Sequence, residues 1–280
     1  MRKNFAEILQ SAKIDYRNEY RKIYKMLFLD TYSVDLYKVS TLYNMFDEAF
    51  TEFRFAGTCL CLKEFDTFHG YHFPDPGKDV TLEDLVSLTE YFYNFIVSFR
   101  DTSTCRELSC PDLNIGFIVD HLTRVTEAIG YTVSDLNGVF ILTEKDAAVT
   151  YVAESELIPG DFSYKMISYN HHSMRGDIEG KKAIIVRLAK ILEGEEKKLD
   201  QVNHGLKKDL FYIFNNFDLR HNNCTDKTKK YKPVIAGMDR NELENWYDET
   251  YRMCLLAFME IEQADRKPGI DGIKARIEAE

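Results

Sequence analysis

The stretch Asp239–Ile261, DRNELENWYDETYRMCLLAFMEI, carries the strongest helical pattern in the chain. Its apolar residues recur at steps of three and four, so they share one face of a helix. Asp239 is expected to cap the start, because Glu242 three positions later is typical of a capping box. The shared face consists of Leu243, Trp246, Tyr247, Thr250, Cys254, Ala257, Phe258 and Ile261. The pattern predicts a long amphipathic helix that packs into a bundle.

Other segments repeat this spacing and extend the helical prediction in both directions. Towards the N-terminus, helices are expected within residues 4–55, over Leu82–Arg100 with Thr81 as its N-cap, and over Asp112–Ile129. Two more stripes precede the last helix: Ala183, Ile184, Leu188, Ile191 and Leu192, then Leu206, Leu210, Phe214 and Phe217. These stripes assign the C-terminal part of the chain to a helical bundle around one apolar seam.

One region has a β pattern instead. Tyr131–Leu136 and Val139–Glu144 flank Asn137-Gly138, a pair that supplies the positive φ angles of a hairpin turn. A third strand is expected over Ala147–Glu154. The predicted class is α+β, mainly α, with N-terminal helices, a small antiparallel β-hairpin or meander and a C-terminal helical bundle. We place the N-terminal region at residues 1–158, with the meander near 131–155, and the bundle at 161–280.

Charge and composition limit the function classes. The chain has 280 residues and a formal net charge of −10, which argues against a protein that coats duplex nucleic acid. No apolar run is long enough to cross a membrane, and the N-terminus lacks the apolar core of a signal peptide. Its six cysteines are scattered, so reduced thiols and a cytoplasmic location are expected.

The segment Asn215–Asn223, NNFDLRHNN, follows an apolar helical run and is densely polar. Such a cluster is costly to bury unless its members bond to one another, so it is either a hydrogen-bond lock or an anion site. In a catalytic interpretation, Arg220 binds a phosphate, His221 transfers a proton and Asp218 orients the imidazole. This set would suit RNA cleavage. Binding candidates beside it are Asn216, Asn222, Asn223 and Lys227.

A structural interpretation explains the same residues. The helix would end at this segment, with Asn222 or Asn223 in the left-handed conformation that closes many helices. Arg220 would then pair with an acidic residue of the final helix, either Asp248 or Glu249. The sequence leaves both interpretations open.

Two helices joined by a polar segment with Arg, His and Asn resemble the HEPN superfamily, whose helical members include ribonuclease toxins and abortive-infection factors. The resemblance covers Lys181–Arg266 and implies metal-independent RNA cleavage in phage defence. In the superfamily's usual signature four to six residues separate the Arg from the His, whereas His221 directly follows Arg220. The whole chain also resembles a bacterial family with the pattern LFYIFNNFDLRHNN…NELENWYDETY, a resemblance that implies no activity.

Two other motifs are rejected on spacing. Cys59, Cys61, His69 and His72 lack the paired CxxC or helical HExxH arrangement of zinc sites. Arg175–Lys182 is one residue short of a Walker loop and lacks its Ser or Thr. No metal or cofactor is therefore expected.

Three functions are compatible with the sequence. The first is a cytosolic interaction or regulatory protein that binds a protein partner or forms a homodimer. The second is a HEPN-like ribonuclease that uses Arg220 and His221, with RNA as substrate. The third is a phosphate-ligand or nucleotide binder without catalysis, centred on Arg220.

Overall fold

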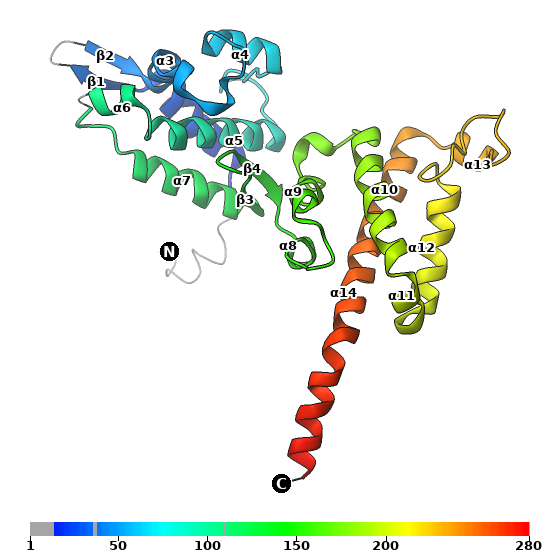
Figure 1. Cartoon of the computed structure of the whole chain (residues 1–280). Coiled ribbons are helices and arrows are strands. Elements are labelled where there is room, and N and C mark those ends of the chain that lie inside the picture. The colour runs from blue at the N-terminus through cyan, green and yellow to red at the C-terminus, as the bar shows by residue number, and fades with distance from the viewer. Residues whose placement is uncertain (1–13, 36–37, 109, 280) are drawn as a thin grey trace, which may run out of the picture. The chain divides into compact units, whose positions relative to one another are not determined.

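The computed structural model describes residues 14–35, 38–108 and 110–279, which are mainly helical with two small antiparallel sheets (Figure 1). The predicted α+β class, dominated by helices, is confirmed. The chain divides into two compact units, Met1–Lys145 and Asp146–Glu280, each with its own apolar core. The helices expected within residues 4–55 begin outside the described residues, which start at residue 14.

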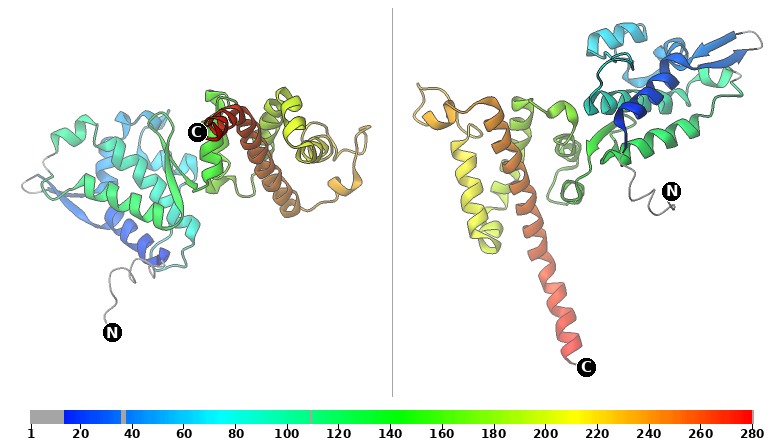
Figure 2. Two further views of the ribbon diagram at one scale, coloured as in Figure 1. Left: turned by 90° about the horizontal axis from the view of Figure 1, so that it is seen from below. Right: turned by 180° about the vertical axis from the view of Figure 1, so that it is seen from behind.

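The N-terminal unit combines short helices with two hairpins. Its helices are α2 (Tyr16–Tyr24), the π-helical η1 (Lys25–Leu29), α3 (Leu42–Glu48), the 3-10 turns η2 (Phe50–Glu52) and η3 (Arg54–Ala56), α4 (Leu62–His69), α5 (Leu82–Phe99), α6 (Ser103–Glu107) and α7 (Ile115–Ala128). Its strands are β1 (Thr31–Asp35), β2 (Lys38–Thr41), β3 (Tyr131–Asp135) and β4 (Phe140–Glu144). Figure 2 gives two further views of these elements.

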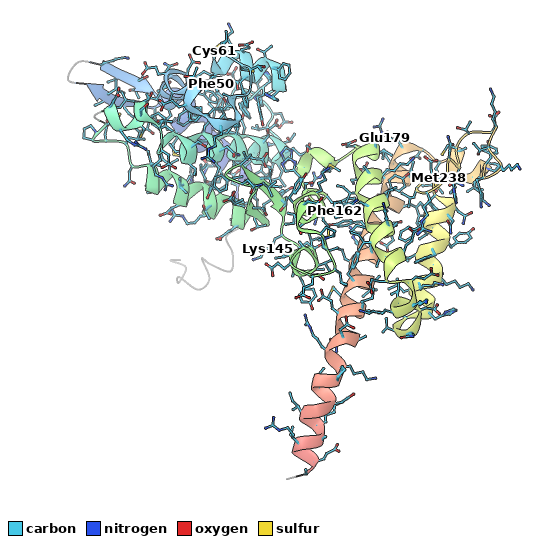
Figure 3. All side chains as sticks on the ribbon, viewed as in Figure 1. Phe50, Cys61, Lys145, Phe162, Glu179 and Met238 are labelled. Atoms are coloured by element: carbon cyan, nitrogen blue, oxygen red, sulfur yellow. The ribbon has the colours of Figure 1, made fainter. Side chains whose placement is uncertain are left out.

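Helix α5 is the centre of this unit. Thr81 and Asp84 form the capping box that fixes its start, as their spacing predicts. Half of its residues are buried, so it presents apolar surface on most sides rather than along one stripe. Rings pack around it, and Phe50, labelled in Figure 3, belongs to the same core. Seven of the 19 phenylalanines of the chain are buried in this core.

The sequence interpretation missed the hairpin β1–β2, which lies inside the region expected to be helical. Helix α2 passes into η1, which ends at Leu29, and Thr31 then pairs with Thr41 across the hairpin. The residues here include Thr31, Val34 and Val39, whose β-branched side chains favour strands. The local strand preference therefore prevails over the three- and four-residue spacing that precedes it.

The hairpin β3–β4 is confirmed. Asn137 and Gly138 take φ angles of 58° and 86°, as the predicted turn requires. Asn94 of α5 binds both backbone groups of Phe140, at 2.7 Å and 2.8 Å, and so satisfies part of a strand edge.

The third strand expected over Ala147–Glu154 is wrong. Ala147–Ala153 forms helix α8, because the Asp146 side chain accepts hydrogen bonds from the amides of Ala148 and Val149 at the helix start. Val149 and Val152 are then buried on one side of the helix. Helix α8 belongs to the C-terminal unit, which begins at Asp146, upstream of the boundary predicted near residues 158–161.

The regular elements that the structure describes in the C-terminal unit are all helices. After α8 come α9 (Gly160–Ser168), the 3-10 turn η4 (His172–Met174), α10 (Ile178–Gly194), α11 (Glu196–Val202), α12 (His204–Asn216), α13 (Pro233–Ala236) and α14 (Arg240–Glu278). Helix α14 starts at Asp239, whose side chain accepts from the Glu242 amide at 2.8 Å. Six of the eight residues of its predicted apolar face are buried in the bundle formed with α8, α10, α11 and α12, whereas Leu243 is half-buried and Trp246 is 39% exposed.

Helix α14 is much longer than the bundle that surrounds its first half. Within its own unit it extends past the other helices, as Figure 1 and the right view of Figure 2 both show. Every residue from 265 to 279 is exposed. None of the described helices is both long enough and apolar enough to span a lipid bilayer.

Candidate functional site

The polar segment Asn215–Asn223 closes the C-terminal end of α12. The helix ends at Asn216, and Asp218 takes a left-handed conformation with φ of 58°. The amide of Arg220 then donates back to the carbonyl of Phe214 at 3.1 Å. The structure thus places the left-handed residue at Asp218, four or five positions before the Asn222 or Asn223 that the sequence suggested.

Asn223 is the centre of this loop and is fully buried. Its Oδ1 accepts from the Asp218 amide at 2.9 Å, and its own amide donates to Asp218 Oδ1 at 3.0 Å. Its Nδ2 donates to the carbonyls of Lys230 at 2.7 Å and Asn215 at 3.4 Å. Its carbonyl accepts from the Lys232 amide at 2.8 Å. One side chain therefore connects the helix end, the turn and the returning chain.

Asp218 is held from two sides. Besides the Asn223 amide, its carboxylate accepts from Lys182 Nζ of α10 at 2.5 Å. The structure therefore joins Asp218 to Lys182 and Asn223, whereas the catalytic interpretation needed it beside the His221 ring. The left-handed backbone of Asp218 is stabilised by the reciprocal bonds with Asn223.

Arg220 packs against helices rather than facing an open cleft. Its guanidinium lies 5.1 Å from the ring centroids of both Phe211 and Phe214 on α12. Its buried Nη2 forms an ion pair with Glu193 of α10, without an aligned hydrogen bond. The expected pairing of Arg220 with Asp248 or Glu249 is therefore wrong, because Glu193 already neutralises the guanidinium beside α12.

The remaining candidates of this segment do not converge on Arg220. His221 is half-buried, and it forms no hydrogen bond or ion pair with the described residues. Asn216 Nδ2 donates to the Tyr212 carbonyl of its own helix at 2.7 Å. Asn222 is exposed and accepts from the Thr225 amide at 3.0 Å, and Lys227 is exposed. This arrangement favours a hydrogen-bond lock over a catalytic site.

The loop is also fastened to α14. The Tyr247 hydroxyl donates to the Phe217 carbonyl at 3.3 Å, and burial is the main cause that raises the pKa of Tyr247. The Phe217 and Trp246 rings lie 5.2 Å apart. Trp246 is the only tryptophan in the chain, so its fluorescence reports on this contact.

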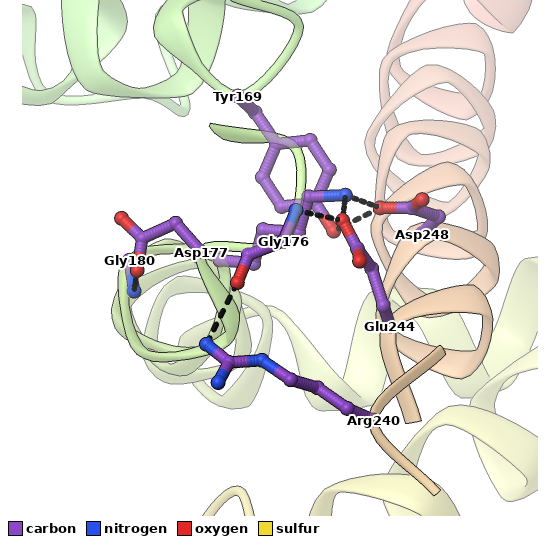
Figure 4. A network of polar contacts seen from close by, with 8 residues as sticks. Tyr169, Gly176, Asp177, Gly180, Arg240, Glu244 and Asp248 are labelled. Atoms are coloured by element: carbon purple, nitrogen blue, oxygen red, sulfur yellow. Dashed lines mark hydrogen bonds and ion pairs between the residues drawn. The ribbon is translucent and has the colours of Figure 1, made fainter. Parts of the chain in front are cut away.

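A second polar cluster, missed by the sequence interpretation, surrounds Lys181 of α10 (Figure 4). Lys181 is 5% exposed, and its Nζ lies 2.7 Å from Glu244 Oε1 and 2.7 Å from Asp248 Oδ1 on α14. The Tyr169 hydroxyl donates to the same Asp248 oxygen at 2.8 Å. We call Tyr169, Lys181, Glu244 and Asp248 the Lys181 cluster.

Neighbouring groups complete this cluster. The amide of Gly176 donates to Glu244 Oε1 at 2.7 Å, and Arg240 Nη2 donates to the Gly176 carbonyl at 2.9 Å. Burial by itself would raise the pKa of Glu244, but the bonds from Lys181 and Gly176 outweigh it and lower that pKa. Burial, then Asp248, raise the pKa of the Tyr169 phenol. Lys181 of α10 contacts both carboxylates of α14, so the cluster joins the two helices.

The sequence contained a signal for Lys181. Ile178, Lys181, Ile185, Leu188 and Leu192 recur at steps of three and four, and all of them are buried on α10. A lysine on the apolar face of a helix needs an acidic partner, because an unpaired charge is costly to bury. Asp248 fills that role here, whereas Glu249 is exposed and lies 3.6 Å from Arg252.

Substitution of Arg220 separates the two interpretations of the loop. We expect Arg220→Ala to lower the free energy of unfolding by about 1–2 kcal/mol, because it removes the ring contacts and the Glu193 pair. The matched control, His221→Ala, should change it by less than about 0.5 kcal/mol. Urea unfolding followed by Trp246 fluorescence measures both values. The nuclease interpretation would instead be supported if the wild type cleaved RNA and both variants lost this activity while their free energy of unfolding stayed unchanged.

Comparison of the chain with protein-family models, with curated proteins and with solved structures finds no match. The HEPN resemblance, the ribonuclease and the phosphate-binding role of Arg220 therefore stay predictions.

Proposed function

We propose that this protein is a cytosolic interaction or regulatory protein, and that it binds a helix of another protein molecule along the outer face of α14. The observation that carries the proposal is a row of large apolar side chains on that face. They are between 37% and 67% exposed, and their steps of three, four and eleven residues keep them on one side of the helix. The row consists of Leu256, Met259, Ile270, Ile273 and Ile277.

The composition of the last turns of α14 supports this proposal. Pro268, Gly269 and Gly272 lie inside the helix, and together they disfavour it by roughly 5 kcal/mol relative to alanine. A helical segment of this length is marginal in water even with good helix formers. The described residues of its own unit do not cover the segment, so a partner helix would supply the missing stabilisation.

The polar clusters of the unit also favour binding over chemistry. In the Lys181 cluster and around Asn223, charges and hydrogen-bonding groups are paired with one another. Groups used in this way stabilise the bundle and present it as a rigid support for α14.

A charge placed within the apolar row tests the proposal. We expect Ile273→Asp to abolish complex formation, because an aspartate cannot be buried against an apolar helix without a large desolvation cost. Ala275→Asp is the matched control, because Ala275 is exposed two residues further on and therefore points to the opposite side. Neither change should alter unfolding followed by Trp246, which lies in the bundle.

Association is measured by sedimentation velocity on the protein alone, and then with a purified protein first captured from extracts of the source cells. A complex in either measurement that Ile273→Asp removes and Ala275→Asp keeps would support the proposal. Absence of any complex, or a complex indifferent to Ile273→Asp, would contradict it.

A further inference from the structure

The outer face of α14 carries a regular seven-position row that extends beyond its apolar members. Successive steps of three and four residues join Leu256, Met259, Gln263, Arg266, Ile270, Ile273 and Ile277. The row spans about 32 Å, or three heptads of a coiled coil. Its apolar members lie at both ends, and the polar Gln263 and Arg266 lie at the centre. We call these seven residues the outer stripe.

The outer stripe is distinct from the face of α14 that forms the core. Cys254, Ala257 and Ile261 are buried in the bundle, and each precedes a member of the stripe by two residues. Two helical residues turn through about 200°, so the apolar members of the stripe point away from the core of the bundle, whereas the Arg266 guanidinium lies 5.3 Å from the Tyr151 ring centroid of α8. Helix α14 therefore has one apolar face inside its own unit and a second one outside it.

Charge divides the stripe region into two halves of opposite sign. Residues 256–265 contain three acids (Glu260, Glu262, Asp265) and no Lys or Arg, which gives a charge of −3. Residues 266–277 contain four basic residues (Arg266, Lys267, Lys274, Arg276) and Asp271, which gives +3. Two parallel copies would place like charge beside like charge, whereas two antiparallel copies place each acidic half beside a basic half.

Resting on the proposed function, we infer that the helix bound by the outer stripe is α14 of a second copy of this chain, in antiparallel orientation. One register pairs six of the seven stripe residues with one another and leaves Ile277 beyond the last pair. Leu256 meets Ile273 of the second copy, Met259 meets Ile270 of the second copy, and Gln263 meets Arg266 of the second copy. A two-fold axis repeats each contact, as in most homodimers.

The same register pairs the charges that flank the stripe. Glu260 and Lys267 each follow a stripe residue directly, and both take the heptad position that faces its equivalent in antiparallel coiled coils. In this register Glu260 lies beside Lys267 of the second copy, and the pair occurs twice. The central Gln263 and Arg266 fix the register, because sliding the helices by one heptad in either direction would set them against apolar residues of the second copy.

The test is self-association of the full-length protein, measured by sedimentation equilibrium. We expect a dimer that Ile273→Asp converts to a monomer and Ala275→Asp preserves. Glu260→Lys and Lys267→Glu should each weaken the dimer by about tenfold, because each puts like charges together twice. Mixing the two single variants, or combining both changes in one chain, should restore wild-type affinity, since opposite charges then meet again.

The outcomes separate the inference from the proposed function. A protein that stays monomeric, but binds another purified protein through Ile273, overturns the inference and leaves the proposed function intact. A dimer whose affinity is not restored in the mixed variants overturns the antiparallel register. A monomer without any Ile273-dependent complex contradicts both. Trp246-monitored unfolding of every variant ensures that a lost dimer is not lost folding.

Discussion

Replacing Lys181 with methionine should lower the free energy of unfolding of the C-terminal unit by about 3–5 kcal/mol near neutral pH. The ammonium is buried between Glu244 and Asp248, at 2.7 Å from an oxygen of each. Without it, two carboxylates of α14 stay close together in a partly buried site with no cation between them. Urea unfolding followed by Trp246 fluorescence measures the change in the unit that contains the cluster.

The defect of this variant should depend on pH. In the wild type the folded pKa of Glu244 is lowered, so its ionised form contributes stability above the usual glutamate pKa. That contribution is lost as pH falls through the lowered pKa. In Lys181→Met the lysine no longer lowers this pKa, so acidification relieves the carboxylate repulsion. The stability difference between wild type and variant should therefore shrink as pH falls.

Two controls make this prediction specific. Lys190→Met removes an exposed lysine from the same helix, and it should change the free energy of unfolding by less than about 0.5 kcal/mol. Adding Glu244→Gln to Lys181→Met should recover part of the loss, because fewer unpaired charges stay buried. Equal effects of Lys181→Met and Lys190→Met would show that the cluster does not stabilise the unit.

Asn223→Ala is expected to cost about 2–4 kcal/mol of the free energy of unfolding of the same unit. Its fully buried side chain serves the Asp218 amide and the Lys230 and Asn215 carbonyls. Alanine leaves these groups without partners, and the left-handed backbone of Asp218 loses the contact that holds it. Trp246 fluorescence should report the loss of structure in this loop, because its ring packs on Phe217 beside the loop.

Asn222→Ala is the matched control for this variant. Asn222 is the neighbouring exposed asparagine, and among the described residues its side chain bonds only to the Thr225 amide, so a loss of about 1 kcal/mol or less is expected. Asn223→Asp keeps an oxygen that can accept from the Asp218 amide, but it removes the Nδ2 that donates to the Lys230 carbonyl. It should lower the free energy of unfolding nearly as much as Asn223→Ala. Equal losses of the free energy of unfolding in Asn223→Ala and Asn222→Ala would show that the hydrogen bonds of Asn223 do not stabilise the loop.

The elements that could be predicted from sequence are those whose local signals agree. Asp239 and Glu242, Thr81 and Asp84, and Asn137-Gly138 each mark a cap or turn by a short-range bond, and all three are present. Residues 147–153 were misassigned because Val149, Thr150 and Val152 prefer strands in isolation. The Asp146 cap and the packing of α8 outweigh that preference.

The polar contacts were harder to predict because they depend on tertiary geometry. The sequence located the Asn215–Asn223 segment but not the partner of Arg220, since Glu193 comes from another helix about 27 positions away. The sequence likewise predicted a structural role for Asp248, but it named Arg220 as the partner, whereas the structure pairs Asp248 with Lys181. Spacing along one helix identifies a face, whereas the partner across a bundle depends on how the helices dock.

Near the point where α14 leaves its own bundle, the Arg266 guanidinium lies 5.3 Å from the Tyr151 ring centroid of α8. Beyond Arg266 lie Ile270, Ile273 and Ile277, whereas all the buried residues of the helix come before it. Tryptic cleavage after Arg266 would therefore remove three of the five apolar anchors and leave the folded core intact, whereas the next basic residue, Lys267, precedes Pro268 and resists cleavage. Controlled digestion offers a way to separate assembly from folding without any substitution.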